Sequence, residues 1–464
     1  MPYAALDGLK EHCGVVAAYG VGDDLPGLLY MGLFALQHRG EEGAGIAVSN
    51  GKQIELVKGP GLVSDVFTVD RLQHLNGIEP TLGIGHVRYA TSDETRFDNI
   101  QPLIVRYLQG SMALALNGNL ANTTRLRREM EDNGQIFQTA SDTEVILNLI
   151  ARYRREGIVT AVQRALSRVH GAYSLVLQSD STLIAVRDAF GFRPLVIGRL
   201  GSGYVVASES CAFDTMGAEL IRDVFPGEII VIDENGLRSE HLPGPPVERH
   251  SCIFEYVYFA RVDSVVDGLN VHMVRRSLGR ILAQEQPADA DIVIGVPDSG
   301  IPAAVGYALE SGLPYEEGLV KNRYVGRTFI SPGQSLRNLK VRLKLNPNRH
   351  VLEGKRVVVV EDSIVRGTTS RNLIRALRAA GATEVHLRIS SPPYISPCYY
   401  GIDTPTADEL VAAQYSIEEI RQMIGADSLG FLSLEGLLRA VPGGGNCLAC
   451  LTGKYPLEVY QERN

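Results

Sequence analysis

Apolar and polar positions alternate over short runs in the first half of the chain. Between residue 13 and about residue 240, stretches rich in apolar and β-branched residues are separated by glycines, a pattern typical of short β-strands. These stretches are EHCGVVAAYG, GAGIAVSN, TLGIGHVRYA, ALALNGNL, AYSLVLQS, TLIAVRDAF, GYVVASES and GEIIVID. Residues 123–134 and 143–169 instead carry apolar residues at helical spacing. Strands in runs with helices in separate blocks predict a layered α+β domain.

The pattern changes after residues 242–250, LPGPPVERH, where three prolines interrupt it. We place a domain boundary here, with a first domain over 13–245 and a second over 246–464. In the second half, DIVIGVPDSGIPAAVGYALESG and KRVVVVEDSIVRGTTSRNLIRALRAAGA each read as a buried strand, a loop and a helix. The VVVV run is typical of a central parallel strand. The second half therefore predicts a doubly wound α/β domain, whose ligands bind beyond the carboxyl ends of the strands.

Composition and charge narrow the classes of function. The 464 residues are 45% apolar and carry a formal net charge of −8. An acidic chain argues against a general role on nucleic acid or on a membrane surface, and no run approaches the ~18 apolar residues that span a bilayer. Residues 1–12 lack the apolar core of a secretory signal peptide, which leaves room for a short pro-segment. We expect a reducing, cytoplasmic setting, in which clustered thiols bind metal or do chemistry.

A phosphate site is indicated directly after the VVVV run. Glu361 and Asp362 follow the strand, where paired carboxylates can hold Mg²⁺ or the hydroxyls of a sugar. RGTT at 366–369 then supplies Gly367, two hydroxyl groups and a row of backbone N–H groups at the start of a helix, which is a cradle for phosphate. The alternative is a plain βα turn with a solvated acidic pair. The acidic pair followed by RGTT favours the ligand site.

This stretch resembles the phosphoribosylpyrophosphate (PRPP) loop of type I phosphoribosyltransferases, and VPDSG at 296–300 resembles their pyrophosphate loop. Residues 321–350 hold eight Lys or Arg and no Asp or Glu. Such a bias suits a lid that closes over a polyphosphate, although a solvated basic surface has the same composition. The segment resembles the flexible loop of the glutamine–PRPP amidotransferase family, whose phosphoribosyltransferase domain is α/β with a parallel sheet. That family usually has two aspartates where this chain has Glu361 and Asp362.

The resemblance implies a set of residues that contact PRPP. They are Asp298, Ser299, Gly300, Lys321, Arg327, Glu361, Asp362, Ser363, Arg366, Gly367, Thr368 and Thr369. Ser299, Glu361 and Asp362 are also expected around Mg²⁺.

The same family joins this domain to an N-terminal-nucleophile glutaminase with αββα layers, and the first half carries its motifs in order. Cys13 falls at the position of the family's nucleophile, which forms a thioester with glutamine. Its freed α-amino group, with an unperturbed pKa of ~7.7–8.0, would be the base. This chemistry requires removal of residues 1–12 as a propeptide.

The remaining glutaminase residues are also carried over from the resemblance. Arg39 in LQHRG, Arg88 in GHVRYAT and Asp142 in SDTEV are expected to bind glutamine. Asn117 and Gly118 in ALNGNLAN resemble the oxyanion hole. Taken singly, NG is a common hairpin turn and SDTE is a helix capping box. After GHVRYAT the chain departs from the family, with SDET where the family has a glycine.

Four of the six cysteines lie in the second half, at Cys252, Cys398, Cys447 and Cys450. Four thiolates can close a tetrahedral zinc site or hold a 4Fe–4S cluster, and spacing does not choose between them. SCIFEYVYFARVDS, SPPYISPCYYGIDTP and NCLACLTG resemble the ligand segments of the cluster-bearing branch of the family. The resemblance implies a structural 4Fe–4S cluster that ties the C-terminal tail to the domain. Cys211 has no match and is expected to be an ordinary buried thiol.

Together the motifs imply an enzyme that hydrolyses glutamine and passes the ammonia internally to PRPP. The products would be 5-phosphoribosylamine, pyrophosphate and glutamate, in the first committed step of purine (IMP) biosynthesis. The family further implies inhibition by purine nucleotides and a homotetramer. One alternative is a protein that binds PRPP only as a regulatory signal, but such a protein needs no glutaminase. Another is a sugar-phosphate aminotransferring glutaminase, whose isomerase half would lack EDSIVRGTTS.

Overall fold

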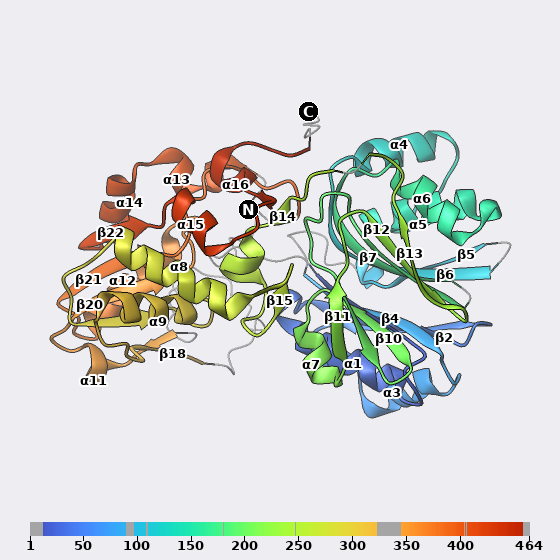
Figure 1. Cartoon of the computed structure of the whole chain (residues 1–464), viewed down its shortest axis with the longest axis horizontal. Coiled ribbons are helices and arrows are strands. Elements are labelled where there is room, and N and C mark those ends of the chain that lie inside the picture. Colours follow the sequence, from blue (N-terminus) through green and yellow to red (C-terminus); the bar gives the residue numbers. More distant parts are fainter. Residues whose placement is uncertain are drawn as a thin grey trace.

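The computed structural model describes residues 13–457 apart from residues 90–96, 108–109, 180, 246, 323–344, 403 and 405. The predicted propeptide and Arg327 lie outside the described residues, as does most of the predicted lid. Figure 1 shows two layered halves beside each other, with the first half rich in strands and the second half built of alternating strands and helices.

Two antiparallel sheets form the centre of the first half (Figure 1). The seven-stranded sheet has the order β11 (Glu219–Asp223), β9 (Val196–Leu200), β10 (Gly203–Ala207), β1 (Gly14–Tyr19), β4 (Leu82–Arg88), β2 (Gly43–Ser49) and β3 (Ile54–Pro60). The six-stranded sheet has the order β13 (Gly236–His241), β12 (Glu228–Asp233), β8 (Thr182–Arg187), β7 (Gly171–Ser179), β6 (Gly110–Leu120) and β5 (Leu103–Tyr107). Because side chains alternate along a strand, Val15 of β1 packs between the sheets while Val16 faces the outer helices.

Helices cover the outer face of each sheet. On the seven-stranded sheet these are α1 (Leu25–Ala35), α2 (Val63–Val66), α3 (Val69–Asn76) and α7 (Cys211–Met216). On the six-stranded sheet the helices α4 (Thr123–Asp132), α5 (Asp142–Tyr153) and α6 (Ile158–Leu166) contribute buried apolar side chains. The predicted αββα layering is thus confirmed.

The predicted helix over 143–169 is wrong as a single element. It divides into α5 and α6, which are separated by a 3₁₀ turn, Arg154–Glu156, and by Gly157. Gly157 has a φ of +94°, a backbone conformation that side chains with a Cβ rarely adopt. Gly157 therefore separates α5 and its 3₁₀ turn from α6.

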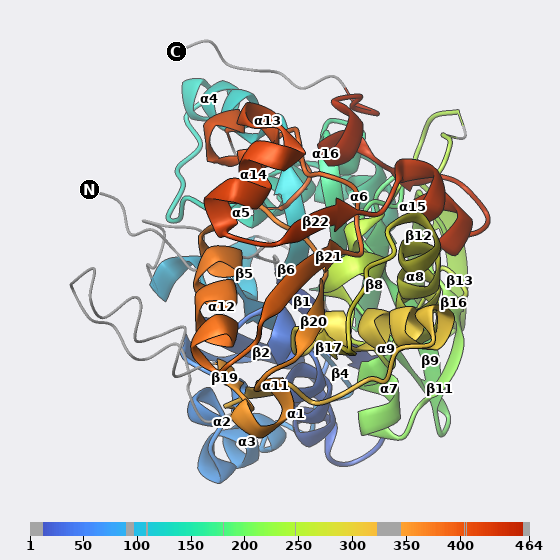
Figure 2. The same cartoon turned by 90° about the vertical axis from the view of Figure 1, so that its left-hand side faces the viewer.

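The second half is built on a parallel sheet, as predicted, with the order β17 (Ile292–Gly295), β20 (Arg356–Glu361), β21 (Glu384–Ile389) and β22 (Ser428–Phe431). Val358 and Val360 of β20 face one side, which is covered by α8 (Val271–Glu285), α9 (Gly300–Ser311) and α15 (Leu434–Ala440). Val357 and Val359 face the other side, covered by α11 (Arg349–Leu352), α12 (Thr368–Ala379) and α14 (Ile417–Ile424). Figure 2 shows these helix groups on opposite faces of the sheet.

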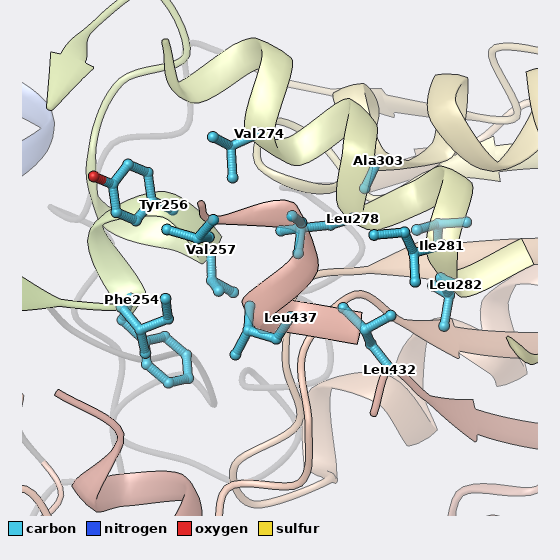
Figure 3. Packing of buried hydrophobic residues seen from close by; sticks show 14 of the residues in the cluster. Phe254, Tyr256, Val257, Val274, Leu278, Ile281, Leu282, Ala303, Leu432 and Leu437 are labelled. Atoms are coloured by element: carbon cyan, nitrogen blue, oxygen red, sulfur yellow. The ribbon is translucent and has the colours of Figure 1, made fainter. Parts of the chain in front are cut away.

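The α8 side of this sheet extends into the segment that follows Cys252. Figure 3 shows Leu278 and Leu282 of α8 beside Leu437 of α15, with Phe254 and Val257 in the same packed group. The last two belong to or flank a π-helical turn, Glu255–Phe259. The turn that carries Glu255 is therefore fixed by the core of the second domain.

Short elements complete the second half. They are β14 (Ser251–Cys252), β15 (Val265–Val266), β16 (Leu269–Asn270), β18 (Leu319–Lys321), β19 (Leu345–Pro347), β23 (Asn446–Cys447), α13 (Val411–Gln414) and α16 (Ala449–Thr452). The last strand of the six-stranded sheet ends at His241 and β14 begins at Ser251, so the exact boundary at residue 245 stays a prediction. Within the described ranges, no helix has the length and apolar character needed to cross a membrane.

Candidate active sites

Cys13 lies directly before β1, at the edge of the sheet where β4 ends. Gly14 pairs with Val87, so Cys13 lies beside the Arg88–Tyr89 end of β4. The thiol Sγ is 4.0 Å from the carbonyl oxygen of Tyr89, and the residue is 9% exposed. Burial raises the pKa of the Cys13 thiol, while the contact with Tyr89 and the charge of Arg88 act in the opposite direction. The thiol is therefore protonated, and a base must take up its proton before the sulfur attacks.

Asn117 and Gly118 lie on β6 of the facing sheet, in register with Ser174 and Tyr173 of β7. The Asn117 side chain is fully buried, and neither its Oδ1 nor its Nδ2 atom has a hydrogen-bond partner among the described residues. Buried amides are nearly always hydrogen-bonded in folded proteins, so this amide is available to a ligand or a water molecule. Gly118 has a φ of +147°, and a Cβ added there would lie 2.0 Å from the carbonyl oxygen of Ala172.

Asp142 begins α5, and its Oδ2 atom accepts a hydrogen bond from the backbone N–H of Leu120 at 3.1 Å. This bond places the carboxylate at the end of the strand that carries Asn117. The capping box suggested by SDTE is only half present. The Ser141 hydroxyl accepts from the N–H of Thr143, whereas Glu144 accepts from the N–H groups of residues 138 and 139.

Arg39 takes part in the contact between the two halves of the chain. Its Nε atom donates to Glu209, and its Nη2 atom donates to Glu255 at 2.5 Å. All three side chains are at most 1% exposed. Two carboxylates thus engage the guanidinium of Arg39, and a role for this residue in binding glutamine stays a prediction.

The predicted PRPP loop begins at the carboxyl end of β20, as expected for a ligand site of a parallel sheet. Glu361 and Asp362 are 7% and 8% exposed. Ser370 donates to Glu361 at 3.0 Å, and Ser363 donates to Asp362 at 2.6 Å. Ser299 also donates to Asp362. Burial raises the pKa of Asp362, while the hydroxyl groups of Ser299 and Ser363 lower it.

The start of α12 follows this acidic pair. Gly367 is its N-cap residue with a φ of +75°, and Thr368 is the first helical residue. Orphan N–H groups and the helix dipole make this end a site for an anion. Arg366 pairs with Glu409 at the side of the loop.

The predicted pyrophosphate loop lies against the PRPP loop. A Cβ added to Gly300 would lie 2.6 Å from the carbonyl oxygen of Val360, so only glycine permits this close approach. Asp298 forms an ion pair with Lys321 of β18. The structure thus brings together two of the three segments assigned to PRPP, together with the first residue of the third.

The four cysteines of the second half come together from three segments. Cys252 of β14 pairs in register with Cys447 of β23. Burial raises the pKa of the Cys450 thiol, and the charges of Cys398, Cys252 and Cys447 raise it further. None of the six cysteines forms a disulfide. Cys211 lies apart from this group, buried beside Glu209.

Sequence reasoning missed a set of buried polar residues at the contact between the domains. They are Arg187, Arg193, Glu209, Glu255 and Asp267. Arg187 pairs with Asp267 at 2.7 Å, and Arg193 donates to Glu255 at 3.3 Å. In the sequence these positions appear only as charged residues next to apolar strands, and exposed charged residues have the same appearance.

Two family models match the chain. A glutamine amidotransferase domain matches residues 86–215, and a phosphoribosyl transferase domain matches residues 262–390. The layered nucleophile domain and the parallel-sheet domain with its phosphate loop thus define a glutamine amidotransferase joined to a phosphoribosyltransferase.

Relatives of known name extend over the whole chain. Amidophosphoribosyltransferase of Bacillus subtilis is 51% identical over 99% of this chain and 97% of its own length. The protein of the same name from Methanocaldococcus jannaschii is 50% identical over 97% of this chain and 99% of its own. A solved structure, described as glutamine PRPP amidotransferase from B. subtilis complexed with ADP and GMP, has a TM-score of 0.91 at 51% identity and covers 97% of this chain and 98% of its own. The chain belongs to the amidophosphoribosyltransferase family, and it is a transferase that aminates PRPP with nitrogen from glutamine in purine biosynthesis.

Proposed function

We propose that glutamine is hydrolysed at Cys13, with Asn117 and Gly118 as the oxyanion hole. The Cys13 sulfur attacks the side-chain amide carbon of glutamine, and the carbonyl oxygen becomes an oxyanion. The side-chain amide of Asn117 and the backbone N–H of Gly118 donate to that oxygen. The observation that carries this assignment is the fully buried Asn117 amide, for which the described residues supply no hydrogen-bond partner.

The proton balance of this step requires a base next to the thiol. We assign it to the α-amino group of Cys13 after residues 1–12 are removed. The amine takes the thiol proton and gives it to the leaving nitrogen, so ammonia departs and a thioester remains. Water then hydrolyses the thioester to glutamate and restores the thiol. Arg88 is proposed to pair with the α-carboxylate of glutamine and Asp142 with its α-ammonium group.

Ammonia then displaces pyrophosphate from C1 of PRPP at the second site. A new C–N bond forms, the C1–O bond breaks and pyrophosphate leaves with that electron pair. The N–H groups at the start of α12, with Gly367, Thr368 and Thr369, are proposed to hold the 5-phosphate. Asp298, Ser299, Gly300 and Lys321 are proposed to line the pyrophosphate position, and Ser363, Arg366 and Arg327 to complete the PRPP contacts.

Mg²⁺ fits the donor set at the end of β20. Magnesium in proteins is commonly bound by one or two carboxylates together with substrate phosphates. Glu361 and Asp362 are two such carboxylates, and Ser299 contacts Asp362. Throughout the described part of the chain, no three His, Cys, Asp or Glu side chains are placed to hold one metal ion. The ion would therefore need further oxygen ligands from PRPP, and it would neutralise negative charge on the pyrophosphate.

We propose a 4Fe–4S cluster rather than zinc at Cys252, Cys398, Cys447 and Cys450. The charges of the other three cysteines raise the pKa of the Cys450 thiol, so the four thiols form one group. Such a group can hold zinc or a 4Fe–4S cluster. The cluster is favoured because the segments that carry the four cysteines resemble the ligand segments of the cluster-bearing branch of the family. The cluster would be structural, because β14 and β23 bring the tail onto the domain.

Regulation, assembly and location follow as proposals from the family. Purine nucleotides are proposed as inhibitors, supported by the B. subtilis structure described with ADP and GMP. We also propose a homotetramer and a cytoplasmic location, with glutamine and PRPP as the substrates.

The proposed function is tested by intact mass, iron and sulfide analysis and a coupled assay on the purified protein. The expected mature chain begins at Cys13, contains iron and sulfide, and forms glutamate and pyrophosphate together in the presence of PRPP. The Cys13→Ser variant should lose glutamine hydrolysis and keep pyrophosphate release with added ammonia. A chain that still begins at Met1 yet hydrolyses glutamine would overturn the α-amine base, and bound zinc without iron would overturn the cluster.

A further inference from the structure

The segment that carries Cys398 reaches back to the glutaminase domain. The Nδ2 atom of Asn119 donates to the carbonyl oxygen of Tyr399 at 2.9 Å, although the two residues are 280 positions apart. The Nη2 atom of Arg193 donates to the next carbonyl oxygen, that of Tyr400, at 3.0 Å. The N–H of Tyr400 in turn donates to the Sγ atom of Cys398 at 3.4 Å. Three consecutive residues thus contact both the cysteine centre and the other domain.

Asn119 lies on the strand of the proposed oxyanion hole. It is two residues beyond Asn117 on β6, and side chains two apart on a strand point to the same face. The next N–H along the strand, that of Leu120, donates to Asp142. Hydrogen bonds therefore tie the end of β6 to Asp142 within its own domain and to Tyr399 across the interface.

Aromatic packing supports the attachment of β6 to the carbonyl oxygen of Tyr399. The rings of Phe192 and Tyr400 stack at a centroid distance of 4.4 Å and an angle of 20°. The same buried group includes Ala172 and Cys447, and Ala172 is the cross-strand partner of Asn119. The backbone around Tyr399 is thus held against β6 and β7, so its carbonyl oxygen is a fixed acceptor.

We propose that Asn119 is a positioning residue for glutamine hydrolysis. Its hydrogen bond to Tyr399 fixes the pleat of β6 and so the direction in which the Asn117 amide and the Gly118 N–H point. The proposal rests on the proposed oxyanion hole and extends it by making its geometry depend on the Cys398 segment. Asn119 itself does not contact glutamine.

The test compares two reactions of the full-length enzyme. Asn119→Ala removes the donor, and Asn119→Asp keeps the shape but replaces the donor with an acceptor. In both variants, the kcat of PRPP-dependent glutamine hydrolysis is expected to fall about 10- to 100-fold, since a donor displaced by about 1 Å can cost that much. The KM for glutamine should change by less than about threefold, because Arg88 and Asp142 keep their places. Ammonia-dependent pyrophosphate release should stay unchanged.

Asn122→Ala is the matched control. Asn122 donates to Arg168 and accepts from His170, so it also ties the end of β6 to its neighbour, but only within the glutaminase domain. This control should lower the Tm without changing the ratio of the two activities. An Asn119 variant with wild-type hydrolysis, an equal loss of both reactions, or the same split in the control would each overturn the proposal.

The oxyanion hole and the positioning role of Asn119 can be refuted separately. If Asn117→Leu leaves hydrolysis intact, the oxyanion hole itself is wrong. If Asn117→Leu abolishes hydrolysis and Asn119→Ala does not affect it, only the positioning role is wrong. Iron content, measured in every variant, should match the wild type, which shows that a loss of hydrolysis does not come from a loss of the cysteine centre.

Discussion

Replacing Asn117 by leucine should separate the stability of the enzyme from its activity. Leucine has the same branching at Cγ as asparagine, but it has no polar atoms. The Asn117 amide is fully buried and its two polar atoms have no partner among the described residues, so the resting protein carries its desolvation cost. That cost is about 1–3 kcal/mol for an amide. The slightly larger leucine offsets part of the gain, because overpacking is also destabilising.

The expected net effect is stabilisation by up to about 2 kcal/mol. For a domain of this size each kcal/mol shifts Tm by about 2–4 °C, so the melting transition of the first domain should rise by up to about 8 °C. Glutamine hydrolysis should fall about 100- to 1,000-fold, which corresponds to about 2.7–4 kcal/mol of lost transition-state stabilisation. Ammonia-dependent amination should be unchanged, since Asn117 lies on β6 of the first domain and the PRPP loop follows β20 of the second.

The assays are glutamate release, pyrophosphate release with ammonia, and thermal unfolding followed by circular dichroism. Asn122→Leu is the control, because Asn122 is also buried but both of its polar groups are hydrogen-bonded. It should be destabilised by about 1–3 kcal/mol. Hydrolysis by Asn117→Leu within fivefold of the wild type would refute the oxyanion role. A Tm several degrees lower would refute the view that the amide lacks a partner in the resting enzyme.

Three further predictions concern pH, the interface and the cysteines. Burial lowers the pKa of His86 to about 3, so folding favours the neutral imidazole. This contribution to the free energy of unfolding is fully present above the unfolded pKa of ~6.5, and it falls by about 1.4 kcal/mol per pH unit below that pH. Denaturant unfolding of His86→Gln should therefore show a smaller loss of stability between pH 6.5 and 5 than the wild type. Glu255→Gln should cost about 3–5 kcal/mol in the same assay, because Arg39 keeps a buried charge with one partner fewer. Cys447→Ala should remove the iron and Cys211→Ala should not, as measured by iron content per chain.

The parts of the fold that the sequence predicts well are those in which local pattern and environment agree. The eight predicted strands are present because one or both faces of each are buried, and the run at β20 is central in its sheet. Helix α1 escaped prediction because it is apolar on nearly every side. Leu29 and Leu33 are buried, yet Phe34 is 52% exposed, so no polar stripe marks the helix.

The site divides in the same way. Cys13, Asn117 and the start of α12 were assigned from short local motifs, and the structure places them before β1, on β6 and after β20, while their roles stay predictions. The ion pair between Arg39 and Glu255 joins residues 216 positions apart, and nothing local in either segment specifies the other. Such contacts depend on how the finished domains dock. The sequence therefore contains no sign that Arg39 pairs with Glu209 and Glu255, and its expected role toward glutamine stays a prediction.

The chemistry of the interface limits how the two sites can communicate. The domains meet through buried charges, with Arg39 and Arg193 on Glu255 and Arg187 on Asp267. A sliding movement that separated one of these pairs while keeping it buried would cost about 3–5 kcal/mol. The bonds that tie β6 to the Cys398 segment cross the same interface. A hinge between the domains would break all of these contacts together. We therefore expect PRPP binding to reach the glutaminase through local rearrangement of side chains and loops around a fixed interface, while the two domains keep their relative orientation.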